Sequence, residues 1–130
     1  MILLDSDVMI DILREYDPAI LWFNSLNDSE ELLLPGYVVM ELIQGCRNKY
    51  EQEKLNNRIG RYISVWPTPK DCGKALNIFT NYRLSHNAGL LDVLIGQTAI
   101  MLNIPLHTFN HKHYAFIPGL KTIQPYEKGT

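Results

Sequence analysis

The chain has 130 residues, of which 46% are apolar and 20% are charged, and its formal net charge is −2. This length predicts one domain over residues 1–130 with its own core, and the composition excludes a disordered or collagen-like chain. Two cysteines are too few for a disulfide scaffold, and no apolar run approaches the about 18 residues of a membrane helix. The first residues also lack a basic leader, so we expect a cytoplasmic protein without membrane contact or signal peptide.

Short apolar runs alternate with stretches in which apolar residues recur at helical spacing. In chain order we expect a strand at 2–4, helices at 8–13 and 17–26, a strand at 32–34, helices at 37–43 and within 47–62, a strand at 65–67, a helix from Pro69 with Leu76 facing inward, a helix at 92–102, and strands at 104–108 and 121–124. The alternation predicts a parallel sheet with helices on both faces. Ligands of such sheets bind beyond the carboxyl ends of the strands, where the strand order reverses.

Three acidic residues stand in apolar surroundings: Asp5 after Ile2-Leu3-Leu4, Glu41 within Tyr37–Ile43, and Asp92 between Leu91 and Val93. A carboxylate withdrawn from water needs a donor, a cation or a raised pKa. A hard divalent ion would satisfy all three, and magnesium prefers oxygen ligands. The alternatives are that Asp5 forms a turn or cap, that Asp92 caps its helix, and that Glu41 faces outward.

Three segments in order match motifs of a known family. LLDSDVMIDIL at the start, VVMELIQG in the middle and LLDVLIGQTAIMLNIPLHTFNHKHY near the end resemble the PIN domains, and most closely the VapC-like ribonuclease toxins of bacterial toxin–antitoxin pairs. The resemblance covers nearly the whole chain. It implies a three-layer α/β/α sandwich around a central, mostly parallel sheet of about five strands.

The resemblance also implies a function. Members are Mg²⁺- or Mn²⁺-dependent endoribonucleases, the toxin components of type II toxin–antitoxin systems, which form homodimers and are silenced by a cognate antitoxin laid across the active-site groove. The catalytic, metal-binding acids correspond to Asp5, Glu41 and Asp92. Many members have a fourth acid where this chain has Asn110, and Thr108 would support the acids with its hydroxyl.

The charge is unevenly distributed, since residues 1–46 hold nine acids and one base, whereas residues 47–83 hold eight bases and three acids. An acidic metal site would repel RNA, so a basic surface elsewhere would help to attract it. Arg47, Lys49 and Arg83 are candidate RNA contacts. The alternative is that the basic stretch is a solvated helix face.

Three other hypotheses remain open at this stage. The protein could be an RNA- or partner-binding module of the same fold that does not cut. Asp5 and Asp7 resemble the paired acids of haloacid dehalogenase-like phosphatases, although the late acidic pair of those enzymes is missing and Asp7 can simply cap a helix. A zinc site could use His107, His111 and His113.

Overall fold

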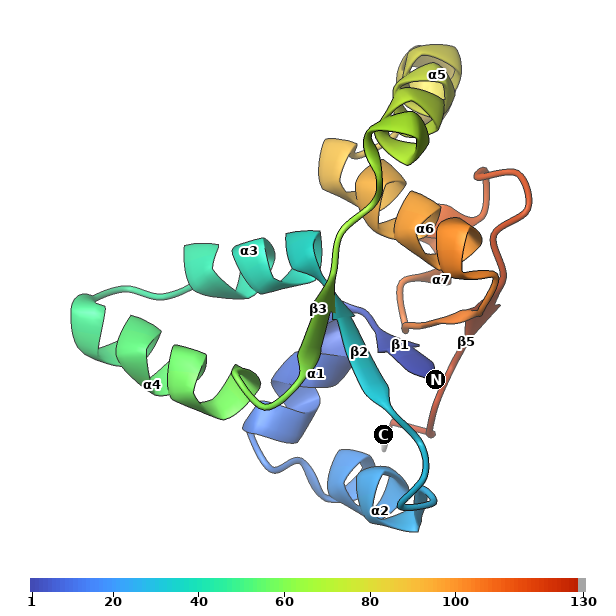
Figure 1. Ribbon diagram of the computed structural model, residues 1–130. Coiled ribbons are helices and arrows are strands. Elements are labelled where there is room, and N and C mark those ends of the chain that lie inside the picture. Colours follow the sequence, from blue (N-terminus) through green and yellow to red (C-terminus); the bar gives the residue numbers. More distant parts are fainter. Residues whose placement is uncertain (129–130) are drawn as a thin grey trace.

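The structure, a computed structural model, describes residues 1–128. Its centre is a five-stranded sheet in the order β3-β2-β1-β4-β5, with every neighbouring pair parallel (Figure 1). The strands are β1 Ile2–Leu4, β2 Leu32–Pro35, β3 Ile63–Val65, β4 Leu106–His107 and β5 Thr122–Ile123. The expected parallel sheet is therefore confirmed. The chain builds outward from β1 to β2 and β3 on one side, and β4 and β5 lie on the other, so the order reverses beside β1.

The helices connect the strands and complete an α/β/α sandwich. They are α1 Ser6–Leu13, α2 Asp17–Ser25, α3 Gly36–Gln44, α4 Lys49–Ile59, α5 Pro69–His86, α6 Leu90–Leu102 and α7 His111–Tyr114. In Figure 1, α3 and α4 project to one side of the sheet, whereas α5, α6 and α7 lie together on another. No helix within residues 1–128 is long and apolar enough to cross a membrane.

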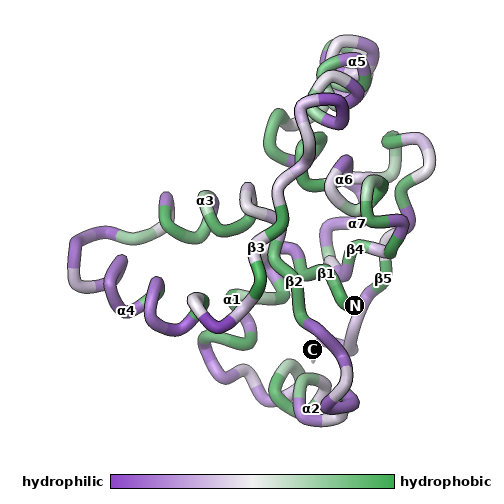
Figure 2. Tube along the Cα trace, viewed as in Figure 1, coloured by the Kyte–Doolittle hydropathy of each residue, from purple (hydrophilic) through white to green (hydrophobic). Residues whose placement is uncertain are grey.

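The core is centred on β1 and on α6, as the sequence predicts. Leu3 and Leu4 are fully buried, because strands covered on both faces bury consecutive side chains. In α6 the residues from Ile95 to Ala99 are all buried, and Gly96 lets the helix approach closely, since a Cβ there would lie 2.8 Å from Cδ1 of Ile117. Figure 2 shows β1 and β2 as hydrophobic and the exposed α4 as largely hydrophilic.

The third strand lies two residues earlier than expected. It ends at Val65, which pairs with Pro35 of β2, rather than running over 65–67. Trp66 instead packs over Gly36, where an added Cβ would overlap the indole ring. The apolar character of Trp66 thus reflects packing at the end of the strand and not a place within it.

Two local expectations are wrong. Leu76 does not face inward, since its side chain is 63% exposed, while its neighbour Ala75 is buried against α6. Only a narrow face of α5 packs against the rest of the protein, so Leu76, one position after Ala75, already points into solvent. The cap of α1 is Asp5, which accepts the backbone N–H of Ser6, so the cap given as an alternative for Asp5 is confirmed and Asp7 does not cap this helix.

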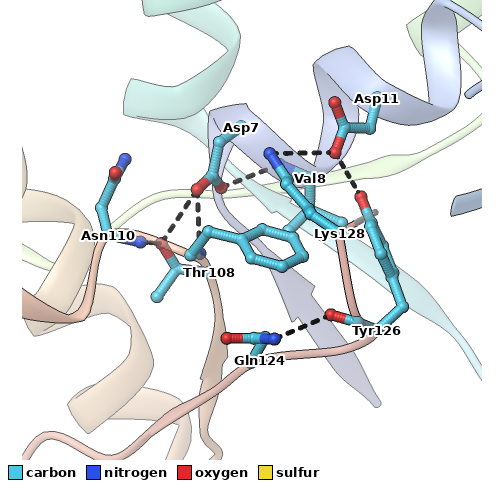
Figure 3. Close-up of polar contacts among 9 residues, drawn as sticks. Asp7, Val8, Asp11, Thr108, Asn110, Gln124, Tyr126 and Lys128 are labelled. Atoms are coloured by element: carbon cyan, nitrogen blue, oxygen red, sulfur yellow. Dashed lines mark hydrogen bonds and ion pairs between the residues drawn. The ribbon is translucent and has the colours of Figure 1, made fainter. Parts of the chain in front are cut away.

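The segment after β5 returns to α1 and fixes its position. The Tyr126 hydroxyl donates to Oδ2 of Asp11 at 2.6 Å, and Nζ of Lys128 lies 3.3 Å from the same atom (Figure 3). The Tyr126 ring also packs against Phe109, with centroids 4.9 Å apart. The helix that begins at Asp5 is therefore held at both β4 and the C-terminal segment.

Candidate active site

Asp5 lies at the carboxyl end of β1 and is only 1% exposed. Its Oδ1 accepts the Ser6 N–H at 2.8 Å, and its Oδ2 accepts the Thr108 hydroxyl at 2.7 Å. Burial and the neighbouring carboxylate of Asp7 raise the pKa of Asp5 to about 6, and the two donated bonds limit that rise. Asp5 both caps α1 and carries a charge with few compensating contacts.

Thr108 joins the ends of β1 and β4. Its oxygen donates to Asp5 and accepts the backbone N–H of Asn110 at 3.0 Å. Next to it, Oδ2 of Asp7 accepts the Phe109 N–H at 2.9 Å, and Figure 3 shows Asp7 facing Thr108. The bonds that Asp5 and Asp7 accept from Thr108 and Phe109 link residues about a hundred positions apart in the chain, and they form where β1 and β4 pair in parallel.

Glu41 reaches the same place from α3. It is half-buried, and burial raises its pKa to about 7, with further increases from Asp5, Asp92 and Asp7. Such mutual repulsion requires carboxylates that lie near one another. Glu41 therefore lies near the other acids, and part of its side chain borders an open groove. We call Asp5, Asp7, Glu41 and Asp92 the acid cluster.

Asp92 stands in the first turn of α6, whose N-cap is Gly89. It is partly buried, and burial raises its pKa, while His113 and the Tyr114 hydroxyl lower it. Nδ1 of His113 lies 3.7 Å from Oδ2 of Asp92. The Asp92 carboxylate lies close to the N-cap Gly89, but no side-chain hydrogen bond caps the helix.

Two residues of this site were not predicted as site residues. Asp7 was assigned only to a helix cap or to the phosphatase hypothesis, yet it belongs to the acid cluster. Tyr114 of α7 is 2% exposed, and its hydroxyl interacts with both Asp5 and Asp92, lowering the pKa of each. The aromatic residue that ends the FNHKHY segment was the available signal for Tyr114.

The cluster fits a divalent cation in its donors and its charge. It supplies only oxygen ligands, and no lysine or arginine pairs with its members within residues 1–128. Within residues 1–128, however, no three His, Cys, Asp or Glu side chains lie close enough together to hold an ion. The carboxylates of the acid cluster are therefore farther apart than the ligands of an assembled metal site.

The candidate RNA-contact residues and Asn110 are exposed, and two of them form ion pairs with glutamates. Arg47 pairs with Glu51 at 2.9 Å and Lys49 with Glu53 at 3.9 Å, both at the exposed start of α4. Arg83 is exposed on α5, and the Asn110 side chain is exposed beside the cluster.

The three histidines of the zinc hypothesis diverge. His107 packs on Trp22, with ring centroids 5.8 Å apart, His111 bonds to the Thr122 hydroxyl at 2.7 Å, and His113 faces Asp92. These contacts contradict a shared zinc site among the described residues.

A parallel α/β sandwich with carboxylates gathered where its strand order reverses defines the class of this protein. Residues 2–116 match the family model of the PIN domain, and the chain belongs to the PIN-domain family. It is 35% identical to ribonuclease VapC10 of Mycobacterium tuberculosis over 123 residues, covering 93% of this chain and 91% of that protein. It is 31% identical to ribonuclease VapC19 of the same organism, covering 92% and 96%.

Solved structures show the same fold. VapBC2 from Rickettsia felis, bound to a DNA fragment from its promoter, superimposes with a TM-score of 0.76 at 23% identity, covering 95% of this chain and 98% of that chain. FitAcB from Neisseria gonorrhoeae superimposes with a TM-score of 0.70 at 22% identity, covering 96% and 98%. The family match leaves the haloacid dehalogenase-like phosphatase hypothesis without support.

Proposed function

We propose that this protein is a metal-dependent endoribonuclease and the toxin of a type II toxin–antitoxin pair. The observation that carries the proposal is the convergence of Asp5, Glu41 and Asp92 from β1, α3 and α6. The similarity to two proteins named as VapC ribonucleases supports RNA as the substrate. The whole of residues 1–130 acts as one domain in this proposal, in the cytoplasm.

The mechanism assigns a role to each residue of the site. Asp5, Glu41 and Asp92 would hold Mg²⁺ or Mn²⁺, which supplies Lewis acidity for phosphodiester hydrolysis. Thr108 and the Ser6 N–H orient Asp5, because each donates to a different oxygen of that carboxylate. Tyr114 supports Asp5 and Asp92 together. Asn110, at the position of the family's fourth acid, would offer a neutral oxygen and no charge.

An antitoxin is the proposed partner, with a second copy of the toxin completing the assembly. An apolar groove of about 320 Å³ opens beside Glu41 between α1, α3 and α4, and is lined chiefly by Ile10, Leu13, Leu42 and Leu55. A segment lying in this groove would reach the acid cluster. One solved structure of the same fold is named as a toxin–antitoxin complex from Klebsiella pneumoniae and two others are named as VapBC structures, which supports such a partner.

Cleavage of structured RNA tests the proposal. The purified protein is expected to cut with Mg²⁺ or Mn²⁺, to stop when EDTA is added, and to lose activity with Asp92→Asn. Asp28→Asn, an exposed acid in the loop before β2, is the matched control and keeps full activity. Activity that survives both EDTA and Asp92→Asn would contradict the mechanism. Retention of RNA without products in either ion would favour the binding-module alternative.

A further inference from the structure

A small cavity opens beside Asp92 and is not lined by any residue of α3. It measures about 220 Å³ and lies between the end of α5, the loop into α6, and α7. Pockets for drug-sized ligands measure about 300–1,000 Å³, so this one suits a smaller, flat group such as a single nucleobase. Asp92 forms part of its wall, which places any occupant next to the acid cluster.

One wall of the cavity is aromatic. His86 and Phe116 both line it, with ring centroids 5.8 Å apart and planes inclined by 34°. Tyr82 packs behind both rings, at 5.2 Å from His86 and 5.4 Å from Phe116. His86 is exposed and Phe116 is partly buried, so the cluster offers an outer surface on a fixed base. Such surfaces stack on unpaired bases with little regard to sequence.

Another part of the wall is cationic because it includes Lys112. Lys112 and His113, both from α7, line the cavity. The Lys112 ammonium is exposed and has no ion pair or hydrogen bond within residues 1–128, so it is free to contact a phosphate. Arg83 lies one turn before His86 on α5, on the same side of that helix. Positive charge is thus present where a polyanion approaching the acid cluster would otherwise be repelled.

A glycine lines the cavity at its junction with the acid cluster. A Cβ at Gly89 would lie 2.7 Å from Oδ2 of Asp92, closer than two such atoms can approach. A larger residue at this position would therefore require the Asp92 carboxylate to shift. The loop, the aromatic wall and the cationic wall together frame one space beside the candidate metal ligands.

We propose that this cavity binds one unpaired nucleotide of the RNA substrate, next to the phosphate that is cut. Its base stacks on His86 and Phe116, and a backbone phosphate contacts Lys112. The substrate is then single-stranded at the cleavage position, because a base must leave its helix to enter the cavity. This inference rests on the proposed ribonuclease function.

Binding of a short single-stranded RNA in EDTA, followed by fluorescence anisotropy, tests the subsite without cleavage. Lys112→Ala should weaken binding and lower the slope of log affinity against log salt by about 0.7, as expected for one lost phosphate contact to a single strand. Lys121→Ala is the matched control, since this exposed lysine precedes β5 and does not line the cavity. His86→Ala should weaken binding about fivefold or more through lost stacking, whereas Tyr50→Ala, an exposed aromatic on α4, should not.

A blunt duplex RNA of the same length distinguishes the subsite from a general basic surface. His86→Ala should leave duplex binding unchanged, because paired bases cannot reach the cavity. Equal losses for single-stranded and duplex RNA, or no loss with either variant, would overturn the subsite while leaving the proposed function intact if the wild type cleaves RNA. A wild type that neither binds nor cuts RNA would overturn both. Phe116→Leu, which keeps an apolar side chain but removes the aromatic ring, is a second variant and should also weaken binding of the single strand.

Discussion

Asp5 and Glu41 carry the same charge at the same site, yet the chain holds them in different ways. Asp5 is almost completely buried, and each of its oxygens accepts a hydrogen bond from a different segment. Glu41 lies on a helix face beside an open groove and is only half-buried. The comparison teaches that one side of the acid cluster is preorganised, whereas the other has room to move toward an ion.

The largest expected effect on cleavage comes from a change at Glu41, the less buried of the two acids. Glu41→Gln should lower RNA cleavage about 100-fold or more, the upper end of losses seen even for residues that only support a metal ligand. The folded state should not suffer, because removing one charge relieves the repulsion that raises the pKa of Glu41. Initial rates of RNA cleavage and thermal melting without metal check both parts. Glu53→Gln, an exposed acid on α4, should change neither.

A change on the preorganised side should lower stability as well as cleavage. Thr108→Val removes the hydroxyl that donates to Asp5 and accepts from Asn110, at a fully buried position. Leaving these groups without partners costs about 1–3 kcal/mol of unfolding free energy, and cleavage should fall about 10-fold or more. Urea denaturation and cleavage rates measure the two losses. Thr108→Ser, which keeps the hydroxyl, should restore most of both, and no rescue by serine would contradict the role of this bond.

Divalent ions should stabilise the protein through both sides of the acid cluster. An ion that binds only the folded state adds about 2.7 kcal/mol when its concentration is a hundred times the dissociation constant. The melting temperature should therefore rise when Mg²⁺ or Mn²⁺ is added. The rise should be smaller in the Glu41→Gln and Asp92→Asn variants. An increase of the same size in these variants would place the ion elsewhere.

The smallest expected effect is on the pH dependence of stability without metal. The pKa of Asp5 is about 6 and that of Glu41 about 7 in the folded state, both above their ordinary values. The folded protein therefore binds more protons than the unfolded chain, and its unfolding free energy should fall as pH rises from about 5 to 8. Urea denaturation across that range measures the slope. The Glu41→Gln variant should show a smaller slope of unfolding free energy against pH. An unfolding free energy that increased with pH over this range would contradict the placement of Asp5 and Glu41 near each other.

Much of the architecture could be predicted because its signals are local. Runs such as Ile2-Leu3-Leu4 identify buried strands, and an acid directly after a strand is placed at the edge of the sheet. The third strand was misplaced because Trp66 is apolar for another reason, its packing on Gly36. Leu76 was expected in the core because periodicity gives the apolar positions of a helix but not the width of the face that packs.

The candidate site shows the same division. Asp5, Glu41 and Asp92 could be singled out because each is an acid among apolar neighbours, and this is visible in single segments. The role of Asp7 could not, since its bond to the Phe109 N–H joins residues that no local pattern relates. The buried hydroxyl of Tyr114, between α6 and the sheet edge, depends likewise on how α7 folds back toward Asp5 and Asp92.

The order of residues alone determined that this chain forms alternating strands and helices, that acids would follow its first strand and begin its sixth helix, and that its family resemblance would lie in three separated segments. Only the tertiary structure decided that β1 and β4 are neighbours and that Thr108 reaches Asp5. The tertiary structure alone also showed that a cavity opens beside Asp92. The physical reason is that periodicity and propensity act over a few residues, whereas repulsion, burial and cavities arise between segments that come together only when the sheet assembles.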